Sequence, residues 1–204
     1  MRDYRNEWMQ KAKIDYFAPF ISLWLACNSW YRSHYSDITS NQDRAFIDKL
    51  KTDFTGRNHL FIRFKEFIDS GEPRKRLSFR NNLELLHYAL ERASLKPERL
   101  IHNCSFSALL IDYNNKDNAT GYISIVLRPR INADGSVHAT DAPNVTLLDR
   151  IYIMNDYEKV FTGLFELIYQ IRNLVIHGHI KPERDEHEVV KCCFLLLSDL
   201  MDLE

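Results

Sequence analysis

The sequence predicts a mainly α-helical protein that carries a small inserted antiparallel β element. Most of the chain has apolar residues at helical spacing, whereas residues 105–154 are rich in β-branched and aromatic side chains. The chain has 204 residues, of which 45% are hydrophobic and 27% are charged, and this composition is typical of a globular protein. We therefore expect residues 1–204 to form a single domain, with residues 105–154 as an insert within it.

The first half of the chain is expected to consist of helices. Pro19 fits a first helical turn, and the apolar residues that follow it at helical spacing are Phe20, Leu23, Trp24, Cys27, Trp30 and Tyr31. Residues 41–53, 58–70 and 83–95 show the same periodicity, and Gly or Pro follows the last two. These segments predict four helices before the insert.

Three strands are expected in the insert: Ala108–Tyr113, Tyr122–Leu127 and Leu147–Met154. The run Asn132-Ala133-Asp134-Gly135 is a typical hairpin turn. Pro129 cannot donate a backbone hydrogen bond, so it should place the second strand at a sheet edge or give that strand a bulge.

Two further helices are expected after the insert. Asn155-Asp156 can cap an apolar helix over Tyr157–His177, and a final helix is expected over Asp185–Leu203. Gly178–Pro182 fits a short turn that joins the two helices in an antiparallel arrangement.

One stripe of the helix expected over 157–177 is polar, although the rest of that helix is apolar. At about 100° per residue, this stripe contains Thr162, Glu166, Gln170, Asn173 and His177. A helix that is apolar on its other sides is mostly buried, so the polar groups must face a partner, a cleft or water. The stripe therefore marks the candidate functional surface.

The end of the same helix combines a guanidinium, an amide and an imidazole. Arg172 precedes Asn173, and His177 lies at the helix end, where the helix dipole favours a protonated imidazole. This set lacks the carboxylates of a hard-metal site and the hydroxyl or thiol of a covalent catalyst. It suits phosphoryl chemistry on RNA, because the 2′-hydroxyl of RNA is itself the nucleophile. Arg can hold a phosphate, and His can move protons near neutral pH.

The run Arg172-Asn173-Leu174-Val175-Ile176-His177 resembles the Arg-x4-6-His motif of HEPN domains. These are α-helical domains of many prokaryotic toxins, phage-defence proteins and RNA-processing factors. A polar residue directly after the Arg, here Asn173, is the pattern of their ribonuclease-active members. The aromatic helix Phe20–Tyr31 is also similar to the first helix of HEPN proteins. The resemblance covers residues 4–95 and 157–203, and the β insert is not part of the minimal HEPN domain.

The resemblance implies a metal-independent endoribonuclease that needs no cofactor and acts on RNA as a homodimer. His177 would then be a general acid or base, Arg172 would stabilise the phosphorane, and Asn173 would orient the phosphate or the imidazole. A role as a toxin or phage-defence effector, with an antitoxin or other defence-system partner protein, is implied as well. HEPN toxins that a partner nucleotidyltransferase modifies carry Tyr two residues after the motif His. Position 179 is His here, so this form of control is not expected.

Further residues are candidates for binding the RNA substrate. Gln170 belongs to the polar stripe, and His179 and Lys181 follow the motif. Arg74 and Arg76 belong to the densest basic cluster of the chain, which would suit a phosphate backbone. A solvated loop explains this basic cluster equally well.

Several alternatives remain open from the sequence. The helix end can be a simple cap, with Arg172 paired to Asp185 or Glu186. A HEPN-type module without activity would bind RNA, a nucleotide or a partner protein through the insert. Asn28 is expected to be a core residue, although it is placed to meet the polar stripe. The ligands of a zinc site, a weaker alternative, would be His177, His179, His187, Glu183 and Asp185.

The charge and the cysteines bound the function further. Lys and Arg total 27 and Asp and Glu total 28, for a formal charge of -1, so RNA must bind at a local basic patch. The longest uncharged run, Tyr16–Tyr31, is shorter than the ~20 apolar residues of a membrane-spanning helix, so no membrane association is expected. The four cysteines include no Cys-x-x-Cys pair, which suits a reducing cytoplasm.

Overall fold

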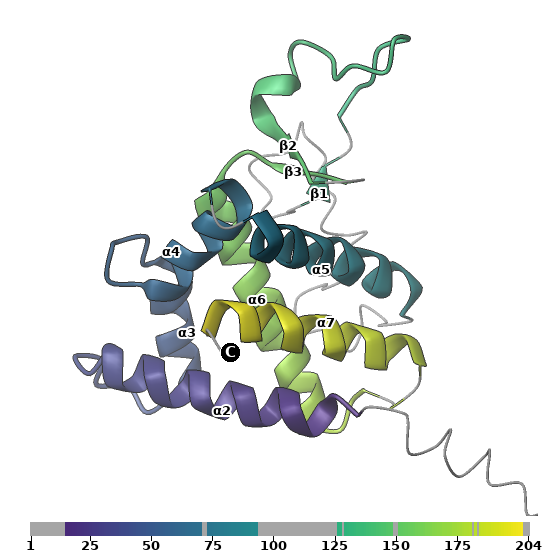
Figure 1. Ribbon diagram of the computed structural model, residues 1–204. Helices are drawn as coiled ribbons and strands as arrows, with labels where there is room; N and C mark the ends of the chain where they lie inside the picture. Colours follow the sequence, from purple (N-terminus) through teal and green to yellow (C-terminus); the bar gives the residue numbers. More distant parts are fainter. Residues whose placement is uncertain are drawn as a thin grey trace, which may run out of the picture.

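The helices and a small sheet define the architecture of the protein (Figure 1). The structure is a computed structural model, and it describes residues 15–70, 73–93, 126–127, 129–148, 151–180, 182 and 184–201. Over these residues the chain is mainly helical, with a small antiparallel sheet between the first four α-helices and the last two. The predicted fold class is confirmed. The expected strand Ala108–Tyr113 lies outside the described residues.

Helices before the sheet form one side of the core. They are α2 (Phe17–His34), α3 (Asp43–Thr52), α4 (His59–Lys65) with the π-helical turn η1 (Glu66–Ser70), and α5 (Pro73–Arg92). The predicted start of the last helix at residue 83 is wrong. Pro73 opens α5, and Phe79 on its second turn is fully buried, whereas Arg74 is exposed. The basic run is therefore the outer face of a helix and not a loop.

Three short antiparallel strands form the sheet, in the order β1-β3-β2. They are β1 (Val126–Leu127), β2 (Val145–Leu147) and β3 (Tyr152–Met154). In agreement with the prediction from Pro129, β1 ends before the proline and lies at an edge of this sheet. The prediction of one strand over residues 147–154 is wrong, because β2 ends at Leu147 and β3 begins at Tyr152. The N–H of Leu148 donates to the carbonyl of Ile151 at 3.0 Å, and both side chains are buried.

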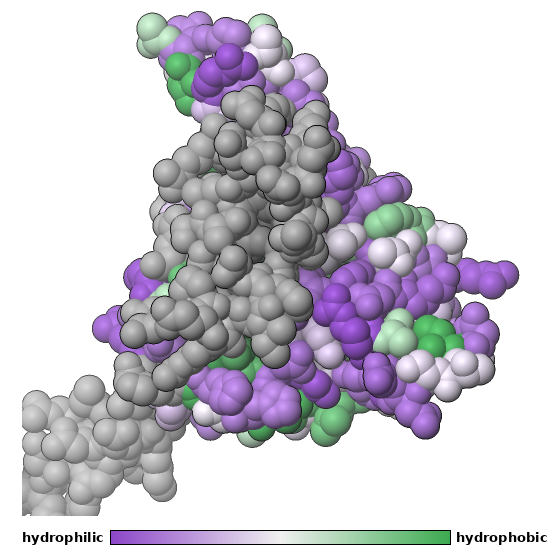
Figure 2. Space-filling view, turned by 180° about the vertical axis from the view of Figure 1, so that it is seen from behind, coloured by the Kyte–Doolittle hydropathy of each residue, from purple (hydrophilic) through white to green (hydrophobic). Residues whose placement is uncertain are grey.

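A hairpin projects from the sheet, away from the helices (Figure 1). Ile131 pairs with Val137, and Gly135 in the predicted turn has a φ of 83°, which glycine adopts without strain. The guanidinium of Arg130 lies 2.7 Å from the carboxylate of Asp141 and holds the base of the hairpin together. Seen from behind, the coloured part of this projection is largely hydrophilic (Figure 2).

The last two helices complete the core. Asp156 caps α6 (Tyr157–Ile176) by accepting from the N–H of Lys159, as predicted, and α7 (Arg184–Met201) packs against α5 and α2. In Figure 1, α6 runs from the sheet across the molecule toward α2. The large side chains buried around it include Trp24, Tyr31, Phe64, Phe79, Phe161 and Phe165. No helix within the described residues combines the length and the apolar character needed to cross a membrane.

Candidate functional site

Most of the polar stripe of α6 faces α3 of the same chain. The carboxylate of Glu166 lies 2.6 Å from Nη1 of Arg44 and 2.5 Å from Nζ of Lys51. Gln170 donates to Glu166 at 2.9 Å, and the Thr162 hydroxyl donates to the carbonyl of Lys51 at 2.8 Å. We refer to these five residues as the α3–α6 seam. The polar side chains of the stripe from Thr162 to Gln170 thus have hydrogen-bond partners within the same chain. Their position does not require a second protomer.

The centre of the seam, Lys51, Glu166 and Gln170, is buried, and each of these side chains is hydrogen-bonded. Glu166 is 1% exposed and Gln170 is 6% exposed. Burial alone would raise the pKa of Glu166, but hydrogen bonds from Arg44, Lys51 and Gln170 outweigh it and hold that pKa below its ordinary value. Gln170 was predicted to bind substrate. Its amide instead donates a hydrogen bond to Glu166 and is buried between α3 and α6.

Beyond Gln170 the stripe meets a carboxylate at the start of α3. Nη2 of Arg172 lies 3.4 Å from Oδ2 of Asp43, and Nη1 of Arg172 donates to Oδ1 of Asn173 at 2.8 Å. The guanidinium carbon of Arg172 lies 5.5 Å from the ring centroid of Trp24 and 6.0 Å from that of Tyr169. The side chains of Arg172 and Asn173 thus contact each other, and the guanidinium lies over Trp24. Among the described residues, no side-chain hydrogen bond joins either of them to His177.

Side chains of α2 also contact the carboxylate of Asp43. Oδ1 of Asp43 accepts hydrogen bonds from Nδ2 of Asn28 at 2.7 Å and from the hydroxyl of Tyr31 at 2.5 Å. Nη2 of Arg32 lies 3.4 Å from the same oxygen, and Nε of Arg32 donates to Asn28 at 3.0 Å. We refer to Asn28, Tyr31, Arg32, Asp43, Arg172 and Asn173 as the Asp43 cluster. Asn28 is therefore half-buried and meets the end of the stripe through Asp43.

Hydrogen bonding in the Asp43 cluster is incomplete. Among the described residues, Oδ2 of Asp43 and Nε of Arg172 are buried and have no hydrogen-bond partner. The 3.4 Å contacts of both arginines with Asp43 are longer than the roughly 2.7–2.9 Å of charge-assisted hydrogen bonds. Burial raises the pKa of Tyr31, and the hydrogen bond to Asp43 raises it further, so the phenol stays a donor. Nε–H of Arg172 is thus a donor that the cluster does not use.

A tight turn after α6 fixes the backbone of the candidate catalytic histidine. His177 caps α6, the N–H of Gly178 donates to the carbonyl of Val175, and the N–H of His179 donates to that of Leu174. This is a Schellman motif, which requires a left-handed residue after the cap, and Gly178 has a φ of 66°. The ring of His177 is exposed and has no hydrogen-bond partner among the described residues.

No family model, no curated protein and no solved structure matches this chain. The geometry of the site therefore carries the functional argument.

Other predicted site residues lie apart from the Asp43 cluster. His179 is exposed, with its ring centroid 6.0 Å from that of His177, and Lys181 lies outside the described residues. Arg74 and Arg76 are in the first turn of α5, where Arg76 donates to the carbonyl of Asp69 at 3.0 Å. That turn lies near the sheet (Figure 1), whereas Arg172 is near the opposite end of α6, a helix about 30 Å long at 1.5 Å per residue.

Two alternatives from the sequence concern the acidic partner of Arg172 and a zinc site at the histidines. The acidic partner of Arg172 is Asp43 and not Asp185 or Glu186, since Asp185 lies 3.9 Å from Arg92. In the part of the chain that the structure describes, no three His, Cys, Asp or Glu side chains are grouped as metal ligands. The ring of His187 accepts a hydrogen bond from the N–H of Tyr16 at the start of α2.

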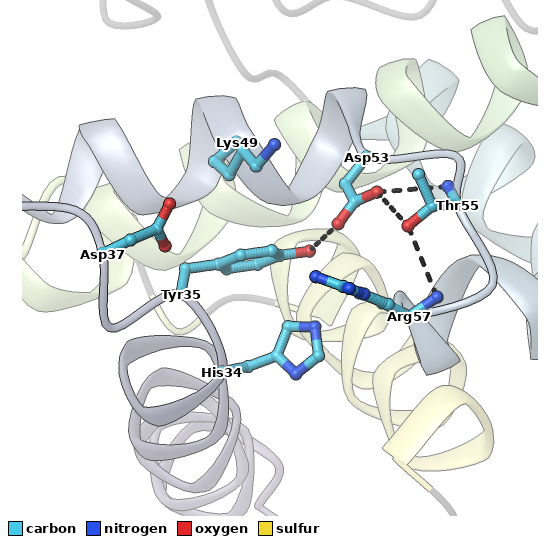
Figure 3. A pocket seen from close by; sticks show the side chains of 7 residues that line it. All are labelled: His34, Tyr35, Asp37, Lys49, Asp53, Thr55 and Arg57. Atoms are coloured by element: carbon cyan, nitrogen blue, oxygen red, sulfur yellow. Dashed lines mark hydrogen bonds between the residues drawn. The ribbon is translucent and has the colours of Figure 1, made fainter.

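A separate pocket of about 770 Å³ lies beside the ends of α2 and α3 (Figure 3). At its centre Asp53 accepts hydrogen bonds from the hydroxyl of Tyr35 and from the N–H and hydroxyl of Thr55. Burial would raise the pKa of Asp53, but the bonds from Thr55 and Tyr35 hold it below its ordinary value. Its lining residues are His34, Tyr35, Asp37, Lys49, Asp53, Thr55 and Arg57. Because two carboxylates balance its Lys and Arg, this pocket has no positive excess for RNA.

Proposed function

We propose that the protein is a metal-independent endoribonuclease of the HEPN type. One observation carries the proposal: the guanidinium of Arg172, which lies over Trp24 and is incompletely bonded to Asp43, is at the same end of α6 as the exposed imidazole of His177. A guanidinium that can bind a phosphate and an imidazole that can exchange protons are the minimum set for cleaving RNA through its own 2′-hydroxyl.

In the proposed reaction the 2′-oxygen attacks the adjacent phosphorus and loses its proton to an imidazole. Arg172 stabilises the extra negative charge on the equatorial oxygens of the phosphorane, and Asn173, bonded to Arg172, orients that guanidinium. The bond from phosphorus to the 5′-oxygen then breaks, and the leaving oxygen takes a proton. The products are a 2′,3′-cyclic phosphate and a 5′-hydroxyl.

A homodimer is part of the proposal, because the reaction needs an acid as well as a base and a second His177 would supply it. The exposed residues of α2 from residue 17 to 29 carry no charge, and Leu25 among them is 60% exposed. These residues are Ala18, Pro19, Ser22, Leu25, Ala26 and Ser29. An uncharged surface beside the Asp43 cluster favours a two-fold contact there. Because a shared site would need His177 from both protomers, an excess of His177→Ala chains mixed with wild-type chains should lower cleavage further than dilution alone does.

The decisive experiment is incubation of the purified protein with total RNA and tRNA in excess chelator. We expect cleavage to persist and the products to end in a 2′,3′-cyclic phosphate. An RNA with a single 2′-deoxy nucleotide at the cleaved position should resist. Dependence on a metal, or cleavage of the deoxy substrate, would refute this mechanism. In the cell we expect a cytoplasmic toxin or phage-defence effector, controlled by a partner protein.

A second candidate function is a non-catalytic module that binds RNA, a nucleotide or a protein. The projecting hairpin favours it, because the Arg130–Asp141 pair and the Gly135 turn give a rigid arm with Ile131 exposed at its edge. Intact RNA after prolonged incubation, together with a partner captured through this hairpin, would favour the module over the ribonuclease.

A further inference from the structure

We infer that Arg32 and Arg172 together bind one phosphodiester of the RNA, and that Asp43 holds the two guanidinium groups on either side of that site. The inference rests on the ribonuclease function proposed above and adds Arg32, on α2, to its substrate-binding residues. Arg32 and Arg172 come from positions far apart in the chain, yet each lies 3.4 Å from a different oxygen of the same carboxylate.

The charge of the site suits a phosphodiester. Two guanidinium groups and one carboxylate leave one positive charge, which matches the single negative charge of a phosphodiester. Asp43 has a second role here, because without it two neighbouring cations would repel each other. A carboxylate that contacts each arginine only at 3.4 Å brings the two together. A phosphate at a shorter distance would form charge-assisted hydrogen bonds with their remaining donors.

Each of the two guanidinium groups lies over an aromatic ring. The guanidinium carbon of Arg32 lies 4.6 Å from the ring centroid of Phe46, and that of Arg172 lies over Trp24. A stacked, planar guanidinium presents its donors in a fixed fork that matches two phosphate oxygens. The side chain of Arg32 is 38% exposed and that of Arg172 is 18% exposed, so the phosphate would enter from the side of Arg32.

The test is RNA binding by Arg32→Ala and Arg32→Lys, each in a His177→Ala background that prevents cleavage. Fluorescence anisotropy with a short single-stranded RNA is measured over a range of salt concentrations. We expect Arg32→Ala to weaken binding by about tenfold and to reduce the slope of log K against log salt by about 0.7. Arg32→Lys keeps the charge and should keep the slope, while affinity falls by a smaller factor.

Arg57→Ala is the matched control, because it removes an exposed arginine of the charge-balanced pocket and should leave both affinity and slope unchanged. RNA cleavage by the wild type together with unchanged binding by both Arg32 variants would overturn the two-arginine site and leave the ribonuclease standing. A wild-type protein that neither binds nor cleaves RNA would overturn both.

Discussion

The α3–α6 seam and the Asp43 cluster each join α6 to α3, yet their chemistry differs. In the seam, Glu166 is 1% exposed and makes contacts of 2.5 to 2.6 Å with Lys51 and Arg44. In the Asp43 cluster, both arginine contacts are 3.4 Å long, and the donor Nε of Arg172 is buried without a hydrogen-bond partner among the described residues.

This difference separates two uses of buried charge. A saturated network fixes the packing of two helices, and its loss is felt as instability. An incompletely bonded network gives up stability, since each unsatisfied buried group costs about 1–3 kcal/mol, and it keeps donors available for a ligand. Substitutions in the seam should therefore change the free energy of unfolding, and substitutions at the end of α6 should change the rate of RNA cleavage.

The largest effect on folding is expected from Glu166→Ala. The substitution leaves Lys51 buried without its closest carboxylate and should lower the free energy of unfolding by about 3–5 kcal/mol. Denaturant titration followed by circular dichroism measures this directly. Glu158→Ala, an exposed carboxylate in the first turn of the same helix, is the control and should change stability little. Equal stability of the two variants would remove the distinction between seam and surface.

A change of intermediate size in the free energy of unfolding is expected when the pH is lowered. The pKa of Glu166 is lowered in the folded protein, and such a carboxylate contributes stability above its unfolded pKa that is lost as the pH falls through the folded pKa. The free energy of unfolding should therefore decline as the pH drops below the ordinary Glu value of 4.5. Glu166→Gln should show a shallower decline over the same range. Parallel curves for the two proteins would show that Glu166 is not paired as described.

The smallest effect is expected from Gly178→Ala. No atom lies within 4 Å of the added Cβ, so the cost arises only from the φ of 66° and should be about 1–2 kcal/mol. Gly56→Ala also meets no atom within 4 Å and has no such φ, so it should be neutral or slightly stabilising. Cleavage should fall in Gly178→Ala alone, because the turn holds the backbone of His177. Equal cleavage by both variants would show that the turn does not position the histidine.

Sequence periodicity predicted most of the helices because their apolar faces are packed in one core. It failed at α5, where charged residues before Phe79 hid a helical first turn, and at residues 147–154, where two strands were taken for one. Apolar residues are buried in both places, Phe79 in α5 and Ile151 before β3, and the ring of Phe79 contacts Phe64 and Phe67 of the preceding helical segment.

The candidate site was predictable only in part. Arg172 and Asn173 were found because their spacing with His177 on an apolar helix carries a local signal. Asp43 and Arg32 were missed because they have no motif of their own and reach Arg172 only when α2, α3 and α6 pack together. Short sequence patterns therefore locate a candidate base or cation, and the fold supplies the residues that hold it.

The most direct test of the account is the RNA cleavage rate of His177→Ala, measured with the melting temperature of the same sample. The side chain is exposed at a helix end, so truncation should leave the melting temperature unchanged, whereas loss of a general acid or base should slow cleavage by about 10²- to 10⁴-fold. Arg172→Lys should act in the same direction, since it keeps the charge near Asp43 but loses the planar fork. Undiminished cleavage by a fully folded His177→Ala protein would contradict the assignment of this helix end as the active site.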